Sequence, residues 1–168
     1  DEVIGAWCCS DIKGSAVSLI DALDAKGIEY VYSPCVSEYG PLDREMLAET
    51  VKDAEVIIAA LAYKASGEAM SMADIELSAS QIKMLKELSA TGKPVIGVLF
   101  NGRPVALGAV VPKVSALLEA WHLGTESGNA VADILFGDFN PTGRLSATVP
   151  YVSSQLPLYY NHPNTGRP

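Results

Sequence analysis

The segment from residue 55 to residue 100 constrains the fold more than any other part of the chain. It begins with a continuous apolar run, Val56–Leu61, and it ends with a second one, Val95–Phe100. Runs of this kind are typical of strands that are buried on both faces of a parallel sheet. Parallel neighbours need a crossover between them, and the intervening residues suffice for a long loop and a helix. The segment therefore predicts a strand, a loop, a helix and a second strand.

The helix of this unit has a clear start signal. Ser78 and Gln81 are spaced as a capping box, and Leu77 and Ile82 are spaced as a hydrophobic staple. The loop before the helix, residues 62 to 77, is long for a compact unit, and loops of this length are often functional. It also leaves the carboxyl end of a strand, where open α/β sheets place their ligands. We therefore expect the functional residues to lie at this end of the sheet.

Strands and helices alternate along the whole chain, which predicts an α/β fold: a three-layer α/β/α sandwich with a mostly parallel sheet. The sandwich is expected over residues 1–149, and residues 150–168, rich in Pro and Tyr, are expected to form an extended C-terminal tail. We expect Val56–Leu61, Val95–Phe100 and Val114–Trp121 to be nearly fully buried central strands. Further strands are expected at 3–7, 28–32 and 145–149, and further helices at 15–26, 42–52 and 125–136.

Composition limits the possible classes of function. Of the 168 residues, 49% are hydrophobic and 19% are charged, as in a globular chain with its own core. The 20 acidic and 12 basic residues give a net charge of -8, which argues against a nucleic-acid surface. No apolar run approaches the length of a membrane span. Cys8, Cys9 and Cys35 form no metal-binding pattern, so we expect buried thiols, no metal and no cofactor.

Four features could carry chemistry, and each has a structural alternative. Glu68 lies in the long, glycine-containing loop and is either a functional acid or a solvated charge. The run Gly124–Gly128 could bind an anion at a helix amino end, or could simply cap the helix. The turn Asn101–Pro104 could contact a ligand through Arg103, or be held by a hydrogen bond from Arg103 to the backbone. His122 follows a buried strand and is either catalytic or structural. A G-x-S-x-G nucleophile motif is absent.

Seven segments resemble, in the same order, segments of the β-glucosidases of glycoside hydrolase family 3. Together they cover nearly the whole chain, and the strongest is Leu135–Leu145. The resemblance implies the second, flavodoxin-like α/β-sandwich domain of such an enzyme. The other matching segments are Ser66–Leu77, Thr91–Val95, Phe100–Pro104, Glu119–Glu126, Gln155–His162 and Asn164–Pro168.

The resemblance also implies a mechanism. In the family an amino-terminal barrel domain carries an aspartate nucleophile, and the sandwich domain lends the general acid/base, which by motif position is Glu68. The implied reaction is retaining hydrolysis of terminal β-linked glucose from glucosides or oligosaccharides. Such a reaction needs two carboxyl groups about 5–5.5 Å apart. The implied partners are therefore the β-glucoside or oligosaccharide substrate and the barrel domain, while the residues that bind the substrate are not assigned.

The chain also departs from the family pattern. Neither a barrel nor a nucleophile is present, and the strand that usually precedes residues 1–7 is missing. Met72 stands where many relatives have Arg, Ser78 where many have Pro, and His122–Leu123 where an aromatic residue and Pro are usual. We therefore expect the chain alone not to hydrolyse an aryl β-glucoside. We also expect the loop at residues 65–72 to be poorly ordered without the barrel.

An incomplete sandwich should expose an apolar face, so we expect the chain to associate with its barrel or with a copy of itself. Two other functions remain open. One is a stand-alone flavodoxin-like module that binds a small ligand or a partner without catalysis. The other is a nucleotide- or phosphate-binding domain that uses the helix starting at Thr125.

Overall fold

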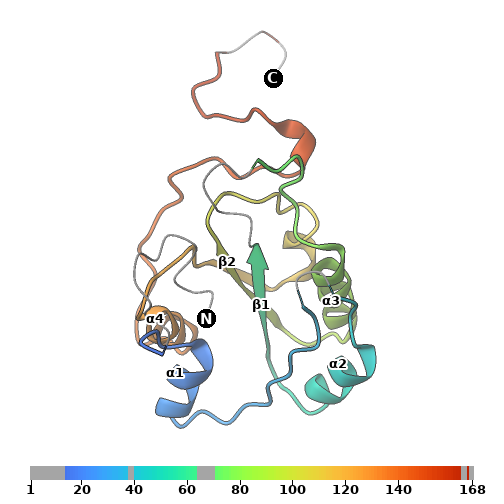
Figure 1. Cartoon of the computed structure of the whole chain (residues 1–168), viewed down its shortest axis with the longest axis vertical. Coiled ribbons are helices and arrows are strands. Elements are labelled where there is room, and N and C mark those ends of the chain that lie inside the picture. The colour runs from blue at the N-terminus through green and yellow to red at the C-terminus, as the bar shows by residue number, and fades with distance from the viewer. Residues whose placement is uncertain (1–13, 38–39, 64–70, 164–165, 167–168) are drawn as a thin grey trace.

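Three parallel strands form the centre of the molecule. A computed structural model of the chain describes residues 14–37, 40–63, 71–163 and 166. Strand β1 (Ile57–Tyr63) pairs with β2 (Val95–Asn101), and β2 pairs with β3 (Ala116–Glu119). Figure 1 shows β1 and β2 side by side, with helices to either side of them.

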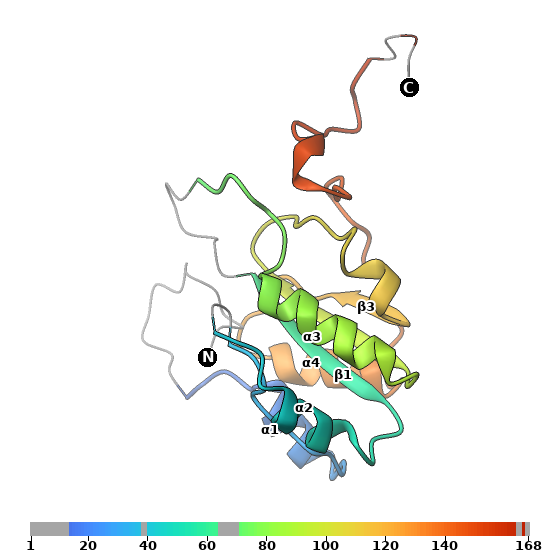
Figure 2. The ribbon, with the colours of Figure 1, turned by 90° about the vertical axis from the view of Figure 1, so that its right-hand side faces the viewer.

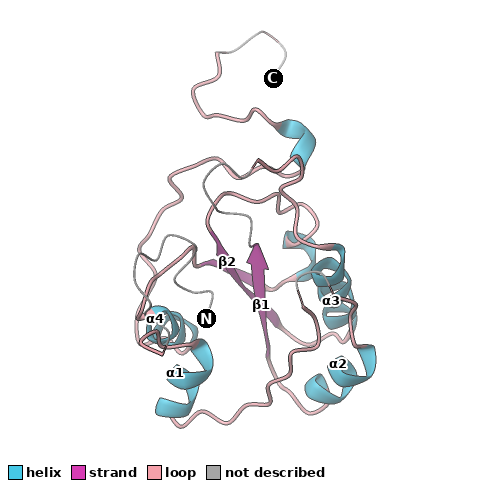
Figure 3. Ribbon diagram, viewed as in Figure 1, coloured by secondary structure: helices cyan, strands magenta, loops and turns pink. Residues whose placement is uncertain are grey.

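Helices cover both faces of the sheet, so the predicted three-layer α/β/α class is confirmed (Figure 3). Helices α2 (Arg44–Val51) and α3 (Ala79–Ala90) lie on one face, and α1 (Leu19–Ala25) packs beside α4 (Ser127–Leu135) on the other. None of the helices in the described part of the chain has the length and apolar content needed to span a membrane. Two short 3-10 helices, η1 (Val111–Lys113) and η2 (Ser153–Gln155), follow later in the chain.

Each face of the sheet has its own apolar cluster. Because side chains alternate along a strand, the odd-numbered residues of β1 and β2 face α2 and α3, whereas Ile58, Val98 and Phe100 face α1 and α4. Leu61, Leu85 and Leu99 are completely buried in the first cluster. The buried residues of the larger cluster are Cys35, Leu47, Val51, Ile57, Ala59, Leu61, Tyr63, Leu77, Met84, Leu85, Leu88, Val95, Leu99, Val105 and Val110.

The expected burial of the three strands is confirmed for β2 and is wrong for β3. β2 has a strand on either side and is mostly buried. β3 is shorter than the expected 114–121, and none of its residues is fully buried. In β1 alternate residues are buried, but Ala60 is exposed and Val56, just before the strand, is 50% exposed. Within the described sheet β1 and β3 are the outer strands, which explains the difference.

Two expected strands are absent from the described residues. Residues 28–32 and 145–149 form no ladder, and Val31 is 75% exposed. Their sequences suit a strand, but a strand needs a neighbour to pair its N–H and C=O groups, and no described segment supplies one. The strand expected at residues 3–7 lies outside the described residues.

Helices α1, α2 and α4 begin later than expected, and α2 begins after Asp43, whose side chain accepts a hydrogen bond from the Met46 N–H at 2.9 Å. Helix α1 begins after Ser18, whose hydroxyl accepts a hydrogen bond from the Asp21 N–H, while the Asp21 carboxylate accepts one from the Ser18 N–H. Val17 therefore lies outside the helix, and its N–H donates to the Thr125 carbonyl at 2.7 Å. Helix α4 begins after Glu126 and not after Thr125. The contact between the two loops thus replaces the first turn expected for α1 and α4.

Gln81 has a different role from the one that the capping-box pattern predicts. Ser78 does cap α3, since its hydroxyl accepts a hydrogen bond from the Gln81 N–H at 3.3 Å. The Gln81 side chain, which is 4% exposed, instead binds the backbone of Ala62 in β1. Its Oε1 accepts from the Ala62 N–H and its Nε2 donates to the Ala62 carbonyl, both at 2.9 Å. One amide thus pairs both backbone groups of an outer-strand residue and fixes α3 against the carboxyl end of β1.

We predict that Gln81→Leu destabilises the chain by about 2 kcal/mol, because it leaves two partly buried backbone groups of Ala62 without partners. Urea unfolding of the purified chain measures the loss. Lys83→Gln, on the exposed side of the same helix, is the matched control and should change the stability by less than about 0.5 kcal/mol. Equal stabilities of Gln81→Leu and Lys83→Gln would contradict this role of Gln81.

Candidate functional site

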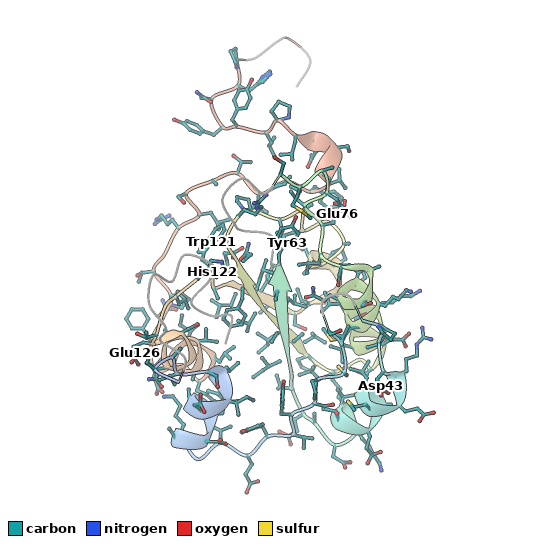
Figure 4. All side chains as sticks on the ribbon, viewed as in Figure 1. Asp43, Tyr63, Glu76, Trp121, His122 and Glu126 are labelled. Carbon is teal, nitrogen blue, oxygen red and sulfur yellow. The ribbon has the colours of Figure 1, made fainter. Side chains whose placement is uncertain are left out.

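The carboxyl ends of the three strands bring three polar side chains into one row. Tyr63 ends β1, Asn101 ends β2 and Glu119 ends β3. The register pairs Tyr63 with Asn101 and Leu99 with Glu119, so all three side chains lie on the face covered by α3. Figure 4 labels Tyr63 at this end of β1, and Trp121 and His122 at the same end of the sheet. This is the edge at which we expect the site, and the site itself stays a prediction.

Tyr63 closes the base of the long loop. Its hydroxyl donates a hydrogen bond to the Asp74 carbonyl at 2.7 Å, and its ring is buried. Together with the Ala62–Gln81 pair, this contact fixes the two points between which the loop runs. Glu68 itself lies outside the described residues, as does most of the 65–72 loop, so the expectations for its role and for the order of the loop stay predictions.

Asn101 holds the turn that follows β2. It is completely buried, and its Nδ2 donates to the Arg103 carbonyl at 2.8 Å. A side chain therefore holds the turn, with Asn101 as the donor in this hydrogen bond, and the expected hydrogen bond from Arg103 to the backbone stays a prediction. The Asn101 Oδ1 has no hydrogen-bond partner among the described residues. A buried carbonyl oxygen without a donor is uncommon, so this amide leaves the polar row incompletely satisfied.

Glu119 is the titratable group of this row that the sequence analysis missed. Burial raises the pKa of its carboxyl to about 7, although the Trp121 N–H, at 3.4 Å, and the Asn101 side chain donate hydrogen bonds that lower it. Trp121 has φ 51°, a left-handed conformation that non-glycine residues rarely adopt, and this sharp bend brings its N–H back to Glu119. The sequence signal that could have identified Glu119 was a carboxylate inside the mostly apolar run at residues 114–121. His122 follows, half-buried, at the same edge.

The helix amino end at Gly124–Gly128, which could have bound an anion, is covered by the segment with Val17 and Ser18. The Gly128 N–H donates to the Val17 carbonyl at 2.9 Å, and a Cβ atom at residue 128 would collide with the Ser18 carbonyl oxygen. Glu126 adds a negative charge at the same helix end and accepts a hydrogen bond from Asn129. An anion would have to displace a backbone contact and meet a carboxylate. The geometry therefore favours helix packing over phosphate binding at this position.

Cys35 is buried, as expected, and its sulfur lies 3.8 Å from the Met84 sulfur. Burial raises the pKa of its thiol. Cys8 and Cys9 lie outside the described residues. Across the part of the chain that the structure describes, no three His, Cys, Asp or Glu side chains are grouped to hold a metal ion.

We predict that Glu119 makes the stability fall as the pH rises. A carboxyl whose folded pKa is raised to about 7 from 4.5 binds its proton more tightly in the folded state. Its contribution is therefore complete below pH 4.5 and is lost as the pH rises through 7. After a discount for partial exposure we expect a loss of about 1–2 kcal/mol. Urea unfolding of wild type and Glu119→Gln at pH 5 and pH 8 measures it, and an equal change in both proteins would contradict it.

Comparison with known proteins identifies the same family as the sequence motifs. The model of the "Glycosyl hydrolase family 3 C-terminal domain" matches residues 2–168. A periplasmic beta-glucosidase of Salmonella typhimurium is 34% identical over 99% of this chain and 25% of its own length. A beta-xylosidase of Formosa agariphila is 33% identical over 86% of this chain and 21% of its own length.

A solved structure gives the same result. The beta-glucosidase of Listeria innocua, in complex with isofagomine, superposes with a TM-score of 0.88 at 36% identity and covers 99% of this chain and 24% of its own. The chain thus spans about a quarter of the length of these relatives. It belongs to glycosyl hydrolase family 3, as a C-terminal domain of that family.

Proposed function

We propose that this chain is the acid/base-bearing domain of a retaining β-glucosidase that removes terminal β-linked glucose from glucosides or oligosaccharides. Glu68 is the general acid/base, and the nucleophile lies on a barrel domain outside this chain. The family match over residues 2–168 carries this proposal. The Salmonella and Listeria relatives, both beta-glucosidases, support the choice of glucose.

The geometry supports the position of the acid. The segment with Glu68 leaves the carboxyl end of β1, next to the polar row of Tyr63, Asn101 and Glu119. The hydrogen bond between Ala62 and Gln81 holds the point where the chain leaves β1. The hydrogen bond from Tyr63 to the Asp74 carbonyl holds the chain after Glu68 next to the same point. The segment with Glu68 thus begins and ends at the edge where an α/β sheet binds its ligands.

The chemistry requires a second domain. Retaining hydrolysis uses one carboxylate to attack the anomeric carbon and one carboxylic acid to protonate the leaving oxygen. Glu68 would donate its proton in the first step and accept a proton from water in the second. For this it must be protonated in the free enzyme, which needs a pKa raised by burial or by the charge of the nucleophile. The chain spans about a quarter of its relatives, which leaves room in them for such a domain.

Exposed apolar side chains support a companion for this chain. Figure 2 shows the segment after η2 extending away from the sandwich. Tyr160, in that segment, is 93% exposed, and Tyr151, Leu156 and Tyr159 are also exposed. Large apolar groups at one end of a molecule are typical of a surface that another domain covers. A stand-alone module without catalysis is the alternative, and it would have to keep these groups in water.

A β-xyloside is the second candidate substrate, because the Formosa relative is a beta-xylosidase. A pocket for xylose must fill the space of the missing hydroxymethyl group, and a pocket for glucose must leave it open. With the barrel domain attached, the ratio of the kcat/KM values for 4-nitrophenyl β-glucoside and 4-nitrophenyl β-xyloside distinguishes the two substrates. We expect the glucoside to be preferred.

We predict that the purified chain does not hydrolyse 4-nitrophenyl β-glucoside, because positioned acid catalysis without a nucleophile accelerates nothing. Steady release of 4-nitrophenol that is lost in Glu68→Gln would show that the chain holds its own nucleophile. Release that persists in Glu68→Gln would point to a contaminating enzyme.

We predict that, with the barrel domain attached, Glu68→Gln lowers kcat on cellobiose by about 10²- to 10⁴-fold, the usual contribution of a general acid. The loss of kcat/KM should be far smaller on 2,4-dinitrophenyl β-glucoside, whose leaving group needs no proton, whereas its kcat should also fall, because the second step still needs Glu68 as a base. Azide, a nucleophile that needs no general base, should restore turnover of this substrate by Glu68→Ala. Glu76→Gln is the matched control and should keep its activity. Equal losses in the Glu68 and Glu76 variants would contradict the role of Glu68.

A further inference from the structure

Three segments that are distant in the sequence meet beside the long loop. The Ala106 N–H donates to the Ile75 carbonyl at 2.9 Å, and Glu76 and Ala106 form a parallel bridge. Next to it, the Leu107 N–H donates to the Pro150 carbonyl at 3.1 Å, and the Gly108 N–H donates to the Tyr151 carbonyl at 2.9 Å. Residues 106–108 thus bind the end of the long loop, at Ile75 and Glu76, and also the start of the C-terminal tail.

A side-chain contact joins the loop segment and the tail directly. The Ser153 hydroxyl donates to Asp74 Oδ1 at 2.8 Å and accepts from the Ile75 N–H at 3.2 Å. The same Asp74 oxygen accepts from the Glu76 N–H at 2.9 Å. The hydrogen bonds from the Glu76 backbone and from Ser153 hold the pKa of Asp74 below its ordinary value, so the carboxylate is ionised at neutral pH.

Asp74 is therefore held from two sides. Its carbonyl accepts from Tyr63, at the end of β1, and its carboxylate accepts from Ser153, in the tail. The chain between Tyr63 and Asp74 contains Glu68. If the Ser153 contact is lost, Asp74 and Ile75 lose side-chain and backbone restraints together, and the segment with one loosened end samples a larger volume.

We propose that Asp74 and Ser153 are positioning residues, which fix the return of the segment that carries Glu68 and so place the acid for proton transfer. This inference rests on the proposed role of Glu68. General acid catalysis needs the donor within hydrogen-bond distance of the leaving oxygen. A displacement of about 1 Å can cost 10²-fold in rate. The tail thereby contributes to the reaction although it need not touch the substrate.

Hydrogen exchange of the purified chain tests the contact itself. In Ser153→Ala the amides of Ile75 and Glu76 should exchange about tenfold faster, because one hydrogen bond is lost and its neighbour is weakened. Ser153→Thr keeps the hydroxyl and should keep the slow exchange. Ser154→Ala, at the exposed neighbouring residue, should have no effect. Unchanged exchange in Ser153→Ala would overturn the proposal, whatever Glu68 does.

Kinetics with the barrel domain attached test the positioning role. In Ser153→Ala and Asp74→Ala, kcat/KM on cellobiose should fall about tenfold or more, while kcat/KM on 2,4-dinitrophenyl β-glucoside, which reports only the first step, stays within about twofold. Asp74→Asn keeps an acceptor oxygen and should recover most of the activity on cellobiose. An equal loss on both substrates would show a merely structural role and overturn the proposal.

The Glu68→Gln protein, measured in parallel, separates the two proposals. If Glu68→Gln shows the leaving-group dependence and Ser153→Ala does not, the positioning role fails and the proposed function stands. If Glu68→Gln does not show that dependence, the proposed function fails, and the positioning role fails with it.

Discussion

The pairing of β1 with β2 is the interaction on which the rest of the structure depends. It aligns Ile57 with Val95 at one end and Tyr63 with Asn101 at the other. Two parallel strands in register place their carboxyl ends at the same edge, and the crossover through α3 covers one face. The long loop, the turn after β2 and the bend at Trp121 then all start from this edge. The position of the polar edge with Tyr63, Asn101 and Glu119 is therefore a consequence of strand register.

Polar groups at this edge are satisfied by contacts that reach across elements. Gln81 of α3 forms hydrogen bonds with the backbone of Ala62. Tyr63 donates a hydrogen bond to the backbone of Asp74, and Asn101 donates one within the turn after β2. Each contact removes the cost of an unpaired buried group and also fixes a loop end in space. The stability of the domain and the position of the two ends of the long loop thus depend on the same hydrogen bonds. Two exceptions remain. The Asn101 Oδ1 has no partner among the described residues, and the partial burial of Glu119 opposes its charge and makes this edge sensitive to pH.

The domain carries one half of a two-carboxylate reaction in the proposed function. The three relatives described above are about four times as long as this chain, and the extended tail presents exposed tyrosines beyond η2. The tail is also bound at its base to the segment after Glu68, through Ser153 and Asp74. In the proposed function, a domain that covers the tail would therefore also influence the position of the segment that carries Glu68.

The sequence by itself determined the α/β class, the strands β1 and β2, the start of α3 at Ser78 and, through its motifs, the family. These features follow from local patterns, such as apolar runs, a capping residue and fixed spacings, which need no knowledge of the neighbours. Only the tertiary structure decided that residues 28–32 and 145–149 have no partner strand among the described residues, that Gln81 binds Ala62, and that Glu119 is partly buried. It also brought Ser153 to Asp74. These outcomes depend on which groups meet in space, because a strand needs a neighbour, a buried carboxyl needs an enclosure, and a hydrogen bond between distant residues leaves no periodic signal along the chain.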